Sequence, residues 1–271
     1  MRIALTIAGS DSGGGAGIQA DLKTFHQFGV HGTSVIVALT AQNTQEVRAV
    51  HPVPLDFIRH QLDVLAEDLP PNALKTGMLG DAATVAVVVE AVRARSWAPL
   101  VVDPVMVSSS GARLLDTSAE SRVRDELLPL AALVTPNLDE AEVLTGLEVR
   151  TPDAMQRAGE ALLQLGAGAA LVKGGHLDGD QLTDLLITPD GTLRFDRPRL
   201  ATRSTHGTGC TLSAAVAAGL ALGHGLEAAV EDALAFVSRA IADAPGLGRG
   251  HGPVNHSVPV RSDRRSVISD R

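Results

Sequence analysis

The stretch Ile3-Ala4-Leu5-Thr6-Ile7-Ala8-Gly9-Ser10-Asp11-Ser12-Gly13-Gly14-Gly15-Ala16-Gly17 opens the chain and decides its fold class. Its first six residues predict a mostly apolar strand, as in a parallel sheet covered by helices on both faces. A run rich in glycine follows, and a helix is expected over Ala16–Phe28. A strand, a glycine-rich loop and a helix in this order indicate an α/β fold.

The same alternation continues along the chain. Further strands are expected over Ser34–Thr40, Ala73–Thr76, Leu100–Asp103, Leu133–Thr135, Ala169–Lys173 and Asp184–Thr188. Further helices are expected over Leu55–Asp68, Asp81–Arg95, Ala119–Leu128, Leu138–Thr145, Pro152–Leu165, Thr211–Leu222 and Leu226–Asp243. The turn Pro189-Asp190-Gly191 predicts a hairpin at an antiparallel edge of the sheet. Ligands of open parallel sheets bind beyond the carboxyl ends of the strands.

The composition limits the classes of function. The chain has 271 residues, of which 45% are apolar and 20% charged, so a disordered or fibrous protein is excluded. A net charge of -8, from 31 acidic and 23 basic residues, argues against a nucleic-acid partner. Aromatic residues make up only 2%, which argues against a platform for stacking bases. The single cysteine, Cys210, excludes an intrachain disulfide and a metal site of several cysteines.

No targeting or membrane segment is expected. Met1–Ala8 is too short for a signal-peptide core with its cleavage site. The charge-free stretch Ser204–Leu226 is interrupted by glycines, whereas a spanning helix needs about 20 mostly apolar residues. We therefore expect a cytoplasmic protein without a membrane partner. No linker or repeat divides residues 1–256, which predicts a single domain, and residues 257–271 lack apolar periodicity, which predicts a flexible tail.

The loop Gly9–Gly17 is the first candidate site. Its glycines would let backbone amides approach an anion or a small polar ligand closely. Ile18 stands where the dinucleotide fingerprint requires glycine or alanine, and no Gly-Lys-Ser/Thr of a Walker loop is present. The alternative is a tight strand-to-helix turn. A ligand role is favoured because five glycines in nine residues exceed what a turn needs.

The second candidate is Thr205-His206-Gly207-Thr208-Gly209-Cys210-Thr211, immediately before the Ala-rich helix. Small residues let successive amides point the same way, and the helix N-terminus adds positive partial charge, which suits a phosphoryl group in transit. The same field would lower the pKa of the Cys210 thiol, so that it could take a proton from an attacking hydroxyl. The alternatives are a Cys210 packed as a small hydrophobic residue and a His206 that only shapes the loop.

Polar residues at predicted strand ends form the third candidate: Asp103, Asn137, Glu140 and Lys173. Carboxylates near a phosphate imply Mg²⁺ held partly through water, and a lysine there neutralises phosphate charge. Each residue alone could instead be a helix cap or a surface charge, and Asp139 is expected to be one. The nine histidines show no His-x₃-His or HExxH pattern, which argues against a transition-metal site.

Gln42, in Thr40-Ala41-Gln42-Asn43-Thr44, is the fourth candidate. An amide presents a donor and an acceptor side by side, which complements the edge of an aminopyrimidine. The alternative is a loop amide that ties down the backbone, and this segment alone favours that alternative.

Together these motifs resemble a known family. The resemblance rests on Gly9–Phe25, Lys75-Thr76-Gly77-Met78-Leu79, Asp103-Pro104-Val105-Met106, Thr135-Pro136-Asn137-Leu138 with Glu140-Ala141, Val172-Lys173-Gly174-Gly175-His176 and Thr205–Thr211. In this order, from Arg2 to His256, they resemble the hydroxymethylpyrimidine/phosphomethylpyrimidine kinases of thiamine biosynthesis, within the ribokinase-like superfamily.

The resemblance implies a three-layer α/β/α sandwich with a mostly parallel central sheet, and two successive phosphorylations of 4-amino-5-hydroxymethyl-2-methylpyrimidine by MgATP. It implies a homodimer as well. Carried over by motif, the implied pyrimidine contacts are Asp21, Gln42, Ala16, Met78 and Val105. The implied roles elsewhere are Mg²⁺ binding by Asp103 and Glu140, ATP binding by Lys173 and Asn137, an anion hole of Gly207, Thr208, Gly209 and Cys210, and base catalysis by Cys210.

Two alternatives stay open at this point. Vitamin kinases that act on pyridoxal or pyridoxine share nearly the same motifs, although the segment matching Ala41-Gln42-Asn43-Thr44 tends to differ in them. A ligand sensor that kept the fold without activity is the other alternative. Intact Gly207–Cys210, Asp103 and Lys173 argue against a sensor, which has no need of parts for phosphoryl transfer.

Overall fold

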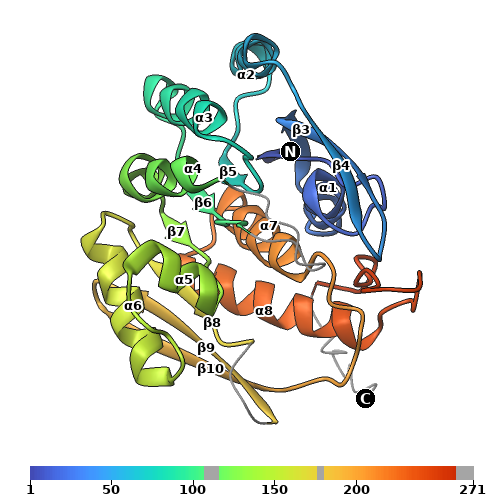
Figure 1. Cartoon of the computed structure of the whole chain (residues 1–271), viewed down its shortest axis with the longest axis vertical. Coiled ribbons are helices and arrows are strands. Elements are labelled where there is room, and N and C mark those ends of the chain that lie inside the picture. The colour runs from blue at the N-terminus through green and yellow to red at the C-terminus, as the bar shows by residue number, and fades with distance from the viewer. Residues whose placement is uncertain (107–115, 176–179, 261–271) are drawn as a thin grey trace, which may run out of the picture.

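The computed structural model describes residues 1–106, 116–175 and 180–260 (Figure 1). Within them the central sheet has eight strands in the order β10-β9-β8-β7-β6-β5-β1-β2. Their bounds are β1 Ile3–Ala8, β2 His31–Ile36, β5 Ala73–Thr76, β6 Leu100–Val102, β7 Leu133–Val134, β8 Ala170–Lys173, β9 Gln181–Thr188 and β10 Gly191–Pro198. Strands β8, β7, β6, β5, β1 and β2 pair in parallel, and β9 and β10 add an antiparallel edge next to β8.

Helices cover both faces of the sheet. Their bounds are α1 Gly17–Gln27, α2 Leu55–Asp68, α3 Ala82–Arg95, α4 Thr117–Arg122, α5 Leu138–Thr145, α6 Pro152–Gln164, α7 Thr208–Ala221 and α8 Leu226–Ala242. Neighbouring residues of one strand face opposite layers: Leu171 packs with the α7 and α8 side chains, whereas Val172 packs with those of α5 and α6. This is the α/β/α sandwich with a mostly parallel sheet that the sequence predicted.

Parallel pairing brings the carboxyl ends of the strands to one edge. β1 pairs with β5, with Ile7 opposite Thr76, and β5 pairs with β6, with Thr76 opposite Val102. Beyond β7, an isolated bridge joins Asn137 to Lys173 at the end of β8. Residues far apart in the chain therefore meet along this edge, where ligands of open α/β sheets bind.

The expectation of one strand over Ser34–Thr40 is wrong. β2 ends at Ile36, and β3 (Ala38–Gln42) leaves the sheet to form an antiparallel hairpin with β4 (Val47–Pro52). The Val37 amide still donates to the Ala8 carbonyl at 3.1 Å, so the chain departs from the sheet only after the end of β1. The hairpin carries Gln42 over the glycine-rich loop, because Ser12 Oγ and the Gln42 backbone hydrogen-bond to each other in both directions at 2.8 Å.

Two other segments differ from expectation. The helix expected over Ala119–Leu128 is a short α4, a π-helical turn at Val123–Leu127 and a 3₁₀ turn at Leu128–Leu130 that contains Pro129. Proline removes a backbone donor, so a regular α-helix cannot continue through it. The predicted hairpin at Pro189-Asp190-Gly191 is confirmed by the β9–β10 pairing, although the sequence analysis did not predict β10 itself.

The residues just beyond His256 pack on the domain. Val258 is buried, and its carbonyl accepts a hydrogen bond from Gln27 Nε2 of α1 at 2.8 Å. Arg239 of α8 donates to the Pro259 carbonyl at 3.0 Å. The packed chain therefore extends to Val260, and the rest of the expected tail, 261–271, lies outside the described residues. In the part of the chain that the structure describes, no helix has the length and apolar character needed to cross a bilayer.

Candidate active site

The two glycine-rich loops pack directly against each other. Gly207 is the N-cap of α7 and adopts φ +81°, a backbone conformation that L side chains rarely adopt. A Cβ at Gly207 would also collide with the carbonyl oxygen of Gly15. Glycine is therefore required at 207 both by the backbone turn and by the approach of the first loop.

Helix α7 begins earlier than the predicted Thr211, at Thr208, so Gly209 and Cys210 lie in its first turn. The amides of Thr208 and Thr211 donate to the carbonyls of Thr205 and Gly207, at 3.3 and 2.8 Å. Within residues 1–106, 116–175 and 180–260, the amides of Gly209 and Cys210 have no hydrogen-bond acceptor. Two free amides at a helix N-terminus are suited to an anion.

The expected low pKa of the Cys210 thiol is wrong. Burial raises the pKa of this thiol to about 12, and the carboxylates of Asp21 and Asp103 add to the effect, whereas Lys75 opposes it. The field of the helix N-terminus does not outweigh the loss of water around the sulfur. At neutral pH Cys210 is therefore a thiol, and its thiolate is a small fraction.

Lys75 is a buried charged residue beside the site to which the sequence motifs assigned no role. It lies in β5 with its side chain fully buried, and its Nζ is 3.1 Å from Asp21 Oδ1 and 3.2 Å from Asp21 Oδ2. Burial opposes the ammonium charge, but Asp21, Cys210 and Asp103 raise the pKa of Lys75 above its ordinary value. The sequence carried a sign of this residue. Lys75 is a charged residue inside Ala73–Thr76, which was predicted as a strand of a sheet covered on both faces.

The Asp21 carboxylate is enclosed by Lys75 and Thr6. Its side chain is 0% exposed, and Thr6 Oγ1 donates to its Oδ2 at 2.6 Å in addition to the two contacts from Lys75. By contrast, the other residues expected to contact the pyrimidine are all partly exposed: Ala16, Gln42, Met78 and Val105. In this structure Asp21 therefore bonds to Lys75 and Thr6, behind the accessible surface.

Asp103 and Lys173 meet beside the first turn of α7. Lys173 Nζ lies 3.5 Å from Asp103 Oδ1, and Ser213 of α7 donates to Asp103 Oδ2 at 3.2 Å. A Cβ on Gly209 would lie 3.5 Å from Lys173 Nζ and 3.7 Å from Asp103 Oδ2. Gly209 thus allows a cation and the free amides of α7, which suit a phosphate, to converge with a carboxylate, which suits the Mg²⁺ that accompanies phosphates.

Asn137 and Glu140 form a capping box on α5. The Glu140 amide donates to Asn137 Oδ1 at 2.9 Å, and the Asn137 amide donates to Glu140 Oε2 at 2.8 Å. Burial raises the pKa of Glu140 to about 7, opposed by Lys173 and reinforced by Asp103. The helix-cap interpretation is thus confirmed for both residues, and Asp139 is an exposed residue paired with Arg150 at 2.9 Å.

Asp103 and Glu140 fit a hard cation in part. Their oxygen donors suit Mg²⁺, which proteins often hold through one or two carboxylates together with phosphate oxygens and water. The raised pKa of Glu140 shows that the second negative charge is poorly compensated by the protein alone. Among the described residues no group of three or more histidine, cysteine or carboxylate side chains could hold a metal ion.

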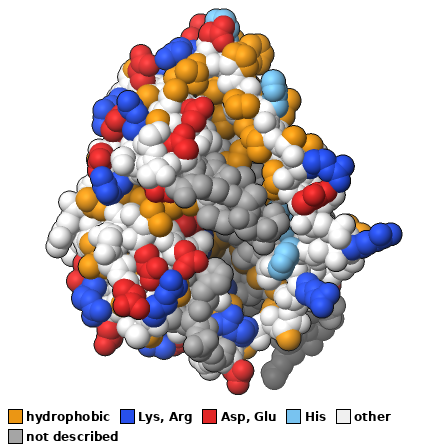
Figure 2. All heavy atoms as spheres, viewed as in Figure 1, with side chains coloured by type: hydrophobic (Ala, Val, Ile, Leu, Met, Phe, Trp, Pro, Cys, Tyr) orange, Lys and Arg blue, Asp and Glu red, His pale blue; other side chains and the backbone are white. Residues whose placement is uncertain are grey.

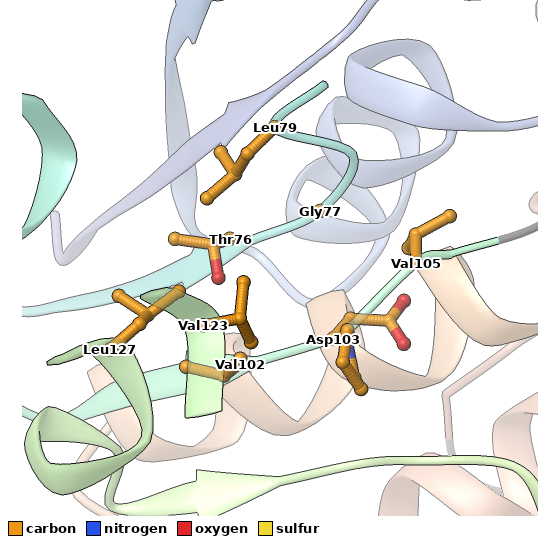
Figure 3. Close-up of a pocket in the computed structure, with 9 residues that line it drawn as sticks. Thr76, Gly77, Leu79, Val102, Asp103, Val105, Val123 and Leu127 are labelled. Atoms are coloured by element: carbon orange, nitrogen blue, oxygen red, sulfur yellow. The ribbon is translucent and has the colours of Figure 1, made fainter. Parts of the chain in front are cut away.

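A small pocket lies at the ends of β5 and β6 (Figure 3). Thr76, Gly77, Leu79, Val102, Asp103, Pro104, Val105, Val123 and Leu127 line it. Figure 3 shows the Asp103 carboxylate pointing toward helix α7, on the other side from Val123 and Leu127. Val105 is the partly exposed residue of this lining among those expected to contact the pyrimidine.

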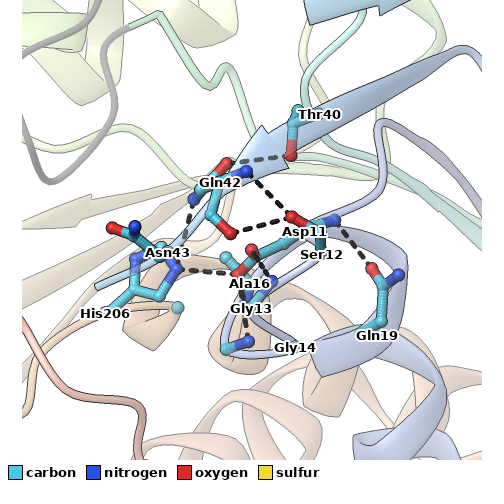
Figure 4. Close-up of polar contacts among 12 residues, drawn as sticks. Asp11, Ser12, Gly13, Gly14, Ala16, Gln19, Thr40, Gln42, Asn43 and His206 are labelled. Atoms are coloured by element: carbon cyan, nitrogen blue, oxygen red, sulfur yellow. Dashed lines mark hydrogen bonds and ion pairs between the residues drawn. The ribbon is translucent and has the colours of Figure 1, made fainter. Parts of the chain in front are cut away.

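Asp11, His206 and Gln42 form a polar cluster between the two loops and the hairpin (Figure 4). His206 Nε2 lies 2.8 Å from Asp11 Oδ2 and 3.3 Å from Gln42 Nε2. Asp11 also accepts hydrogen bonds from the amides of Gly13, Gly15 and Ala16. The sequence analysis left His206 as a residue that only shapes the loop, and it did not predict the link to Asp11. His176 of the fifth motif lies outside the described residues.

Comparisons with known proteins find a kinase family and solved kinase structures similar to this chain. The family model described as phosphomethylpyrimidine kinase matches residues 11–255. A hydroxymethylpyrimidine/phosphomethylpyrimidine kinase of Rhizobium meliloti is 51% identical over 94% of this chain and 96% of its own. The crystal structure of a phosphomethylpyrimidine kinase of Clostridium difficile has a TM-score of 0.81 and 43% identity over 89% of this chain and all of that one. An ADP complex of the pyridoxal kinase of Bacillus subtilis has a TM-score of 0.89 and 37% identity, covering 95% and 98% of the two chains.

Proposed function

The chain belongs to the phosphomethylpyrimidine kinase family, and we propose that it phosphorylates 4-amino-5-hydroxymethyl-2-methylpyrimidine and then the monophosphate, in thiamine biosynthesis. ATP is the phosphoryl donor. The observation that carries this proposal is the first turn of α7, where the free amides of Gly209 and Cys210 lie beside Lys173 and Asp103. Residues 1–256 act as one kinase domain, with Ser257–Val260 packed on it.

The phosphoryl group passes over the first turn of α7. The substrate hydroxyl oxygen attacks the γ-phosphorus of ATP, the bond from phosphorus to the ADP oxygen breaks, and charge develops on the transferred group. The free amides of Gly209 and Cys210 donate to that charge, and Lys173 Nζ neutralises part of it, whereas the Thr208 amide of the expected anion hole is already bonded to the Thr205 carbonyl. Asn137 lies at the end of the next strand, where its backbone bridges to Lys173, and is the further candidate for contact with ATP.

Asp103 and Glu140 would hold Mg²⁺. When bound, the ion supplies charge neutralisation for the ATP phosphates. Thr135 and Ser213 donate to the two oxygens of Asp103, at 3.3 and 3.2 Å, and so fix the plane of its carboxylate toward the phosphate site.

Cys210 is the candidate base for the substrate hydroxyl. Because its thiol pKa is about 12, only a small thiolate fraction exists at neutral pH, but that thiolate is a strong base. In a loose transition state the hydroxyl proton leaves late, so a scarce base can serve. The buried ammonium of Lys75 is the charge that favours the thiolate, since it acts against burial.

The pyrimidine would lie between the first loop and the hairpin. Gln42 presents an amide to its amino edge, while Ala16, Met78 and Val105 supply apolar contacts. Met78 is tied to the first loop, because the Gly9 amide donates to the Met78 carbonyl at 3.1 Å. Asp21 acts from behind through Lys75, and a direct contact with substrate would require its bonds to Lys75 and Thr6 to open.

Pyridoxal kinase activity is the second candidate function, favoured by one observation. The pyridoxal kinase of Bacillus subtilis shares the fold over nearly the whole of both chains. An assay of ADP release with saturating Mg²⁺, comparing the hydroxymethylpyrimidine, its monophosphate and pyridoxal, separates the two functions. A higher kcat/KM for pyridoxal than for the pyrimidine would assign the chain to pyridoxal.

A cytoplasmic homodimer is the proposed state. Large apolar side chains are exposed on the hairpin (Leu39 and Val50, each 47%) and on α2 (Phe57, 57%, and Val64, 60%). Figure 2 shows apolar side chains gathered over this end of the molecule. A contiguous apolar patch suits an interface between copies, and light scattering after size-exclusion chromatography tests it. The reducing cytoplasm would protect Cys210 from oxidation, so that its thiolate stays available as the base.

A further inference from the structure

The cluster of Asp11, His206 and Gln42 does more than hold the two loops together, because it also contacts the side-chain amide expected to bind the pyrimidine. We infer that His206, held by Asp11, fixes which way the Gln42 amide faces, and that it thereby selects ligands with a ring nitrogen next to an amino group. His206 is then a specificity-determining positioning residue. The inference rests on the proposed function in one respect, namely that Gln42 contacts the substrate.

The protonation of His206 follows from Asp11. Asp11 is 2% exposed, and its carboxylate already accepts amide hydrogen bonds from Gly13 (2.8 Å), Gly15 (3.0 Å) and Ala16 (2.8 Å). Although burial opposes it, the hydrogen bonds from His206 and from the amides of Ala16 and Gly13 lower the pKa of Asp11. An ionised carboxylate only accepts hydrogen bonds. The His206 Nε2, 2.8 Å from Asp11 Oδ2, therefore carries a hydrogen.

That hydrogen decides what Gln42 can present to His206. As placed, the Gln42 nitrogen lies 3.3 Å from His206 Nε2, so two N–H donors face each other. The two ends of an amide have nearly the same shape, and their assignment rests on the hydrogen-bond partners. With the amide turned by 180°, its oxygen accepts from the His206 Nε2–H, which Asp11 and Gln42 then share.

Thr40 gives the same answer independently. Its hydroxyl donates to the Ser10 carbonyl at 2.9 Å, so its proton is engaged there. The other end of the Gln42 amide lies 3.3 Å from Thr40 Oγ1, which can only accept. The amide end that faces Thr40 is therefore the NH₂ group. Two neighbours on different segments, Thr40 on β3 and His206 before α7, impose one orientation on Gln42.

A fixed amide offers a fixed order of groups to a ligand. After these contacts, the Gln42 oxygen keeps one lone pair and its nitrogen keeps one N–H. They complement an amino group and an adjacent ring nitrogen, which the hydroxymethylpyrimidine carries side by side. Pyridoxal has a ring nitrogen without an amino neighbour. It can use only half of this pattern and leaves the other half unpaired, which is how sites built on hydrogen bonds reject analogues.

The experiment compares kcat and KM for the hydroxymethylpyrimidine and for pyridoxal in four proteins: the unaltered chain, His206→Met, His206→Gln and the exposed-histidine control His31→Met. His206→Met removes the ring donor. KM for the pyrimidine should rise roughly tenfold, as expected for a lost hydrogen bond, while kcat and the values for pyridoxal change less than twofold. His206→Gln supplies an N–H donor again and should recover most of the preference. His31→Met should leave it unchanged.

A double-mutant cycle isolates the coupling. With Gln42→Met already present, His206→Met should alter the ratio of the two kcat/KM values less than twofold. Thr40→Val, which removes the second partner, should reduce the preference in the same direction and serves as the readout if His206→Met does not fold. An unchanged ratio in both His206→Met and Thr40→Val would overturn the inference. If the unaltered chain phosphorylates neither pyrimidine, the proposed function fails instead.

Discussion

Lys75 and Asp21 form a fully buried ion pair, with Nζ 3.1 Å from Oδ1, and both charges act on the pKa of the Cys210 thiol. Thr6 completes the bonding of the carboxylate at 2.6 Å. A charge pair with no exposed surface is expensive to form and strongly destabilising to break. The pair and Thr6 join β1, β5 and α1, and the Lys75 ammonium also favours the thiolate of Cys210. The stability of these three elements and the pKa of Cys210 therefore depend on the same lysine.

Removal of one partner should destabilise the fold more than removal of both charges. Lys75→Met leaves an unpaired buried carboxylate and should lower the free energy of unfolding by about 3–5 kcal/mol. The double variant Lys75→Met/Asp21→Asn carries no buried charge there and should lose less than Lys75→Met alone. Urea unfolding followed by far-UV circular dichroism measures both. Equal losses would mean that the pair is not buried as described.

The pH dependence of kcat should report the Cys210 thiol. Its pKa is about 12, so at any pH well below 12 the thiolate fraction rises tenfold for each unit by which the pH increases. If thiolate is the base, log kcat rises by about one unit per pH unit between pH 8 and 9.5. Cys210→Asp supplies a base that is already ionised, so its profile should be flat in this range, and Cys210→Ala should lower kcat roughly 100-fold. A flat profile for the unaltered chain would exclude the thiolate as base.

Two glycines with similar backbone angles make a matched pair for the loop contact. Gly207 has φ +81° and abuts the Gly15 carbonyl, whereas Gly29 has φ +73° with open space around it. Gly29→Ala tests the cost of positive φ alone. Gly207→Ala adds the collision, so it should be the more destabilising of the two and should raise KM for ATP at least tenfold. A Gly207→Ala variant that behaves like Gly29→Ala in both respects would contradict the packing of the two loops.

The Mg²⁺ concentration needed for activity should depend on Asp103 and Glu140 and not on Asp139, the carboxylate that precedes Glu140. Asp103→Asn and Glu140→Gln each remove a candidate ligand and should raise the Mg²⁺ concentration for half-maximal activity at fixed ATP several-fold. Asp139→Asn changes an exposed carboxylate that lies one residue from Glu140 and pairs with Arg150, and it should leave that concentration unchanged. A similar shift in all three variants would point to a general effect of charge rather than to a site.

The sequence predicted those elements whose pattern is local. Leu55–Asp68 has the predicted bounds, since its helical period places Ile58 and Leu62 on one buried face, and Ala73–Thr76 has the predicted bounds as well. Helix α6 begins at the predicted Pro152, and the Thr151 side chain caps it by accepting from the Ala154 amide. The break at Val37 was not predictable, because the residues on both sides favour a strand and only the end of β1 decides where pairing stops.

The candidate site was predictable in its parts and not in its electrostatics. The motifs placed Asp103, Lys173 and Gly209 at chain positions that the parallel sheet brings together. The pKa of Cys210 depends on how much water surrounds the sulfur and on Asp21 and Asp103, which are remote in the chain. The link from His206 to Asp11 spans 195 residues and has no local signature.

The most direct test of the account is ADP release by the purified chain with MgATP and each candidate substrate in turn. We expect release that depends on the hydroxymethylpyrimidine, continued release with its monophosphate, and a higher kcat/KM for the pyrimidine than for pyridoxal. No ADP release with either pyrimidine, under conditions in which the chain is folded and binds ATP, would contradict it.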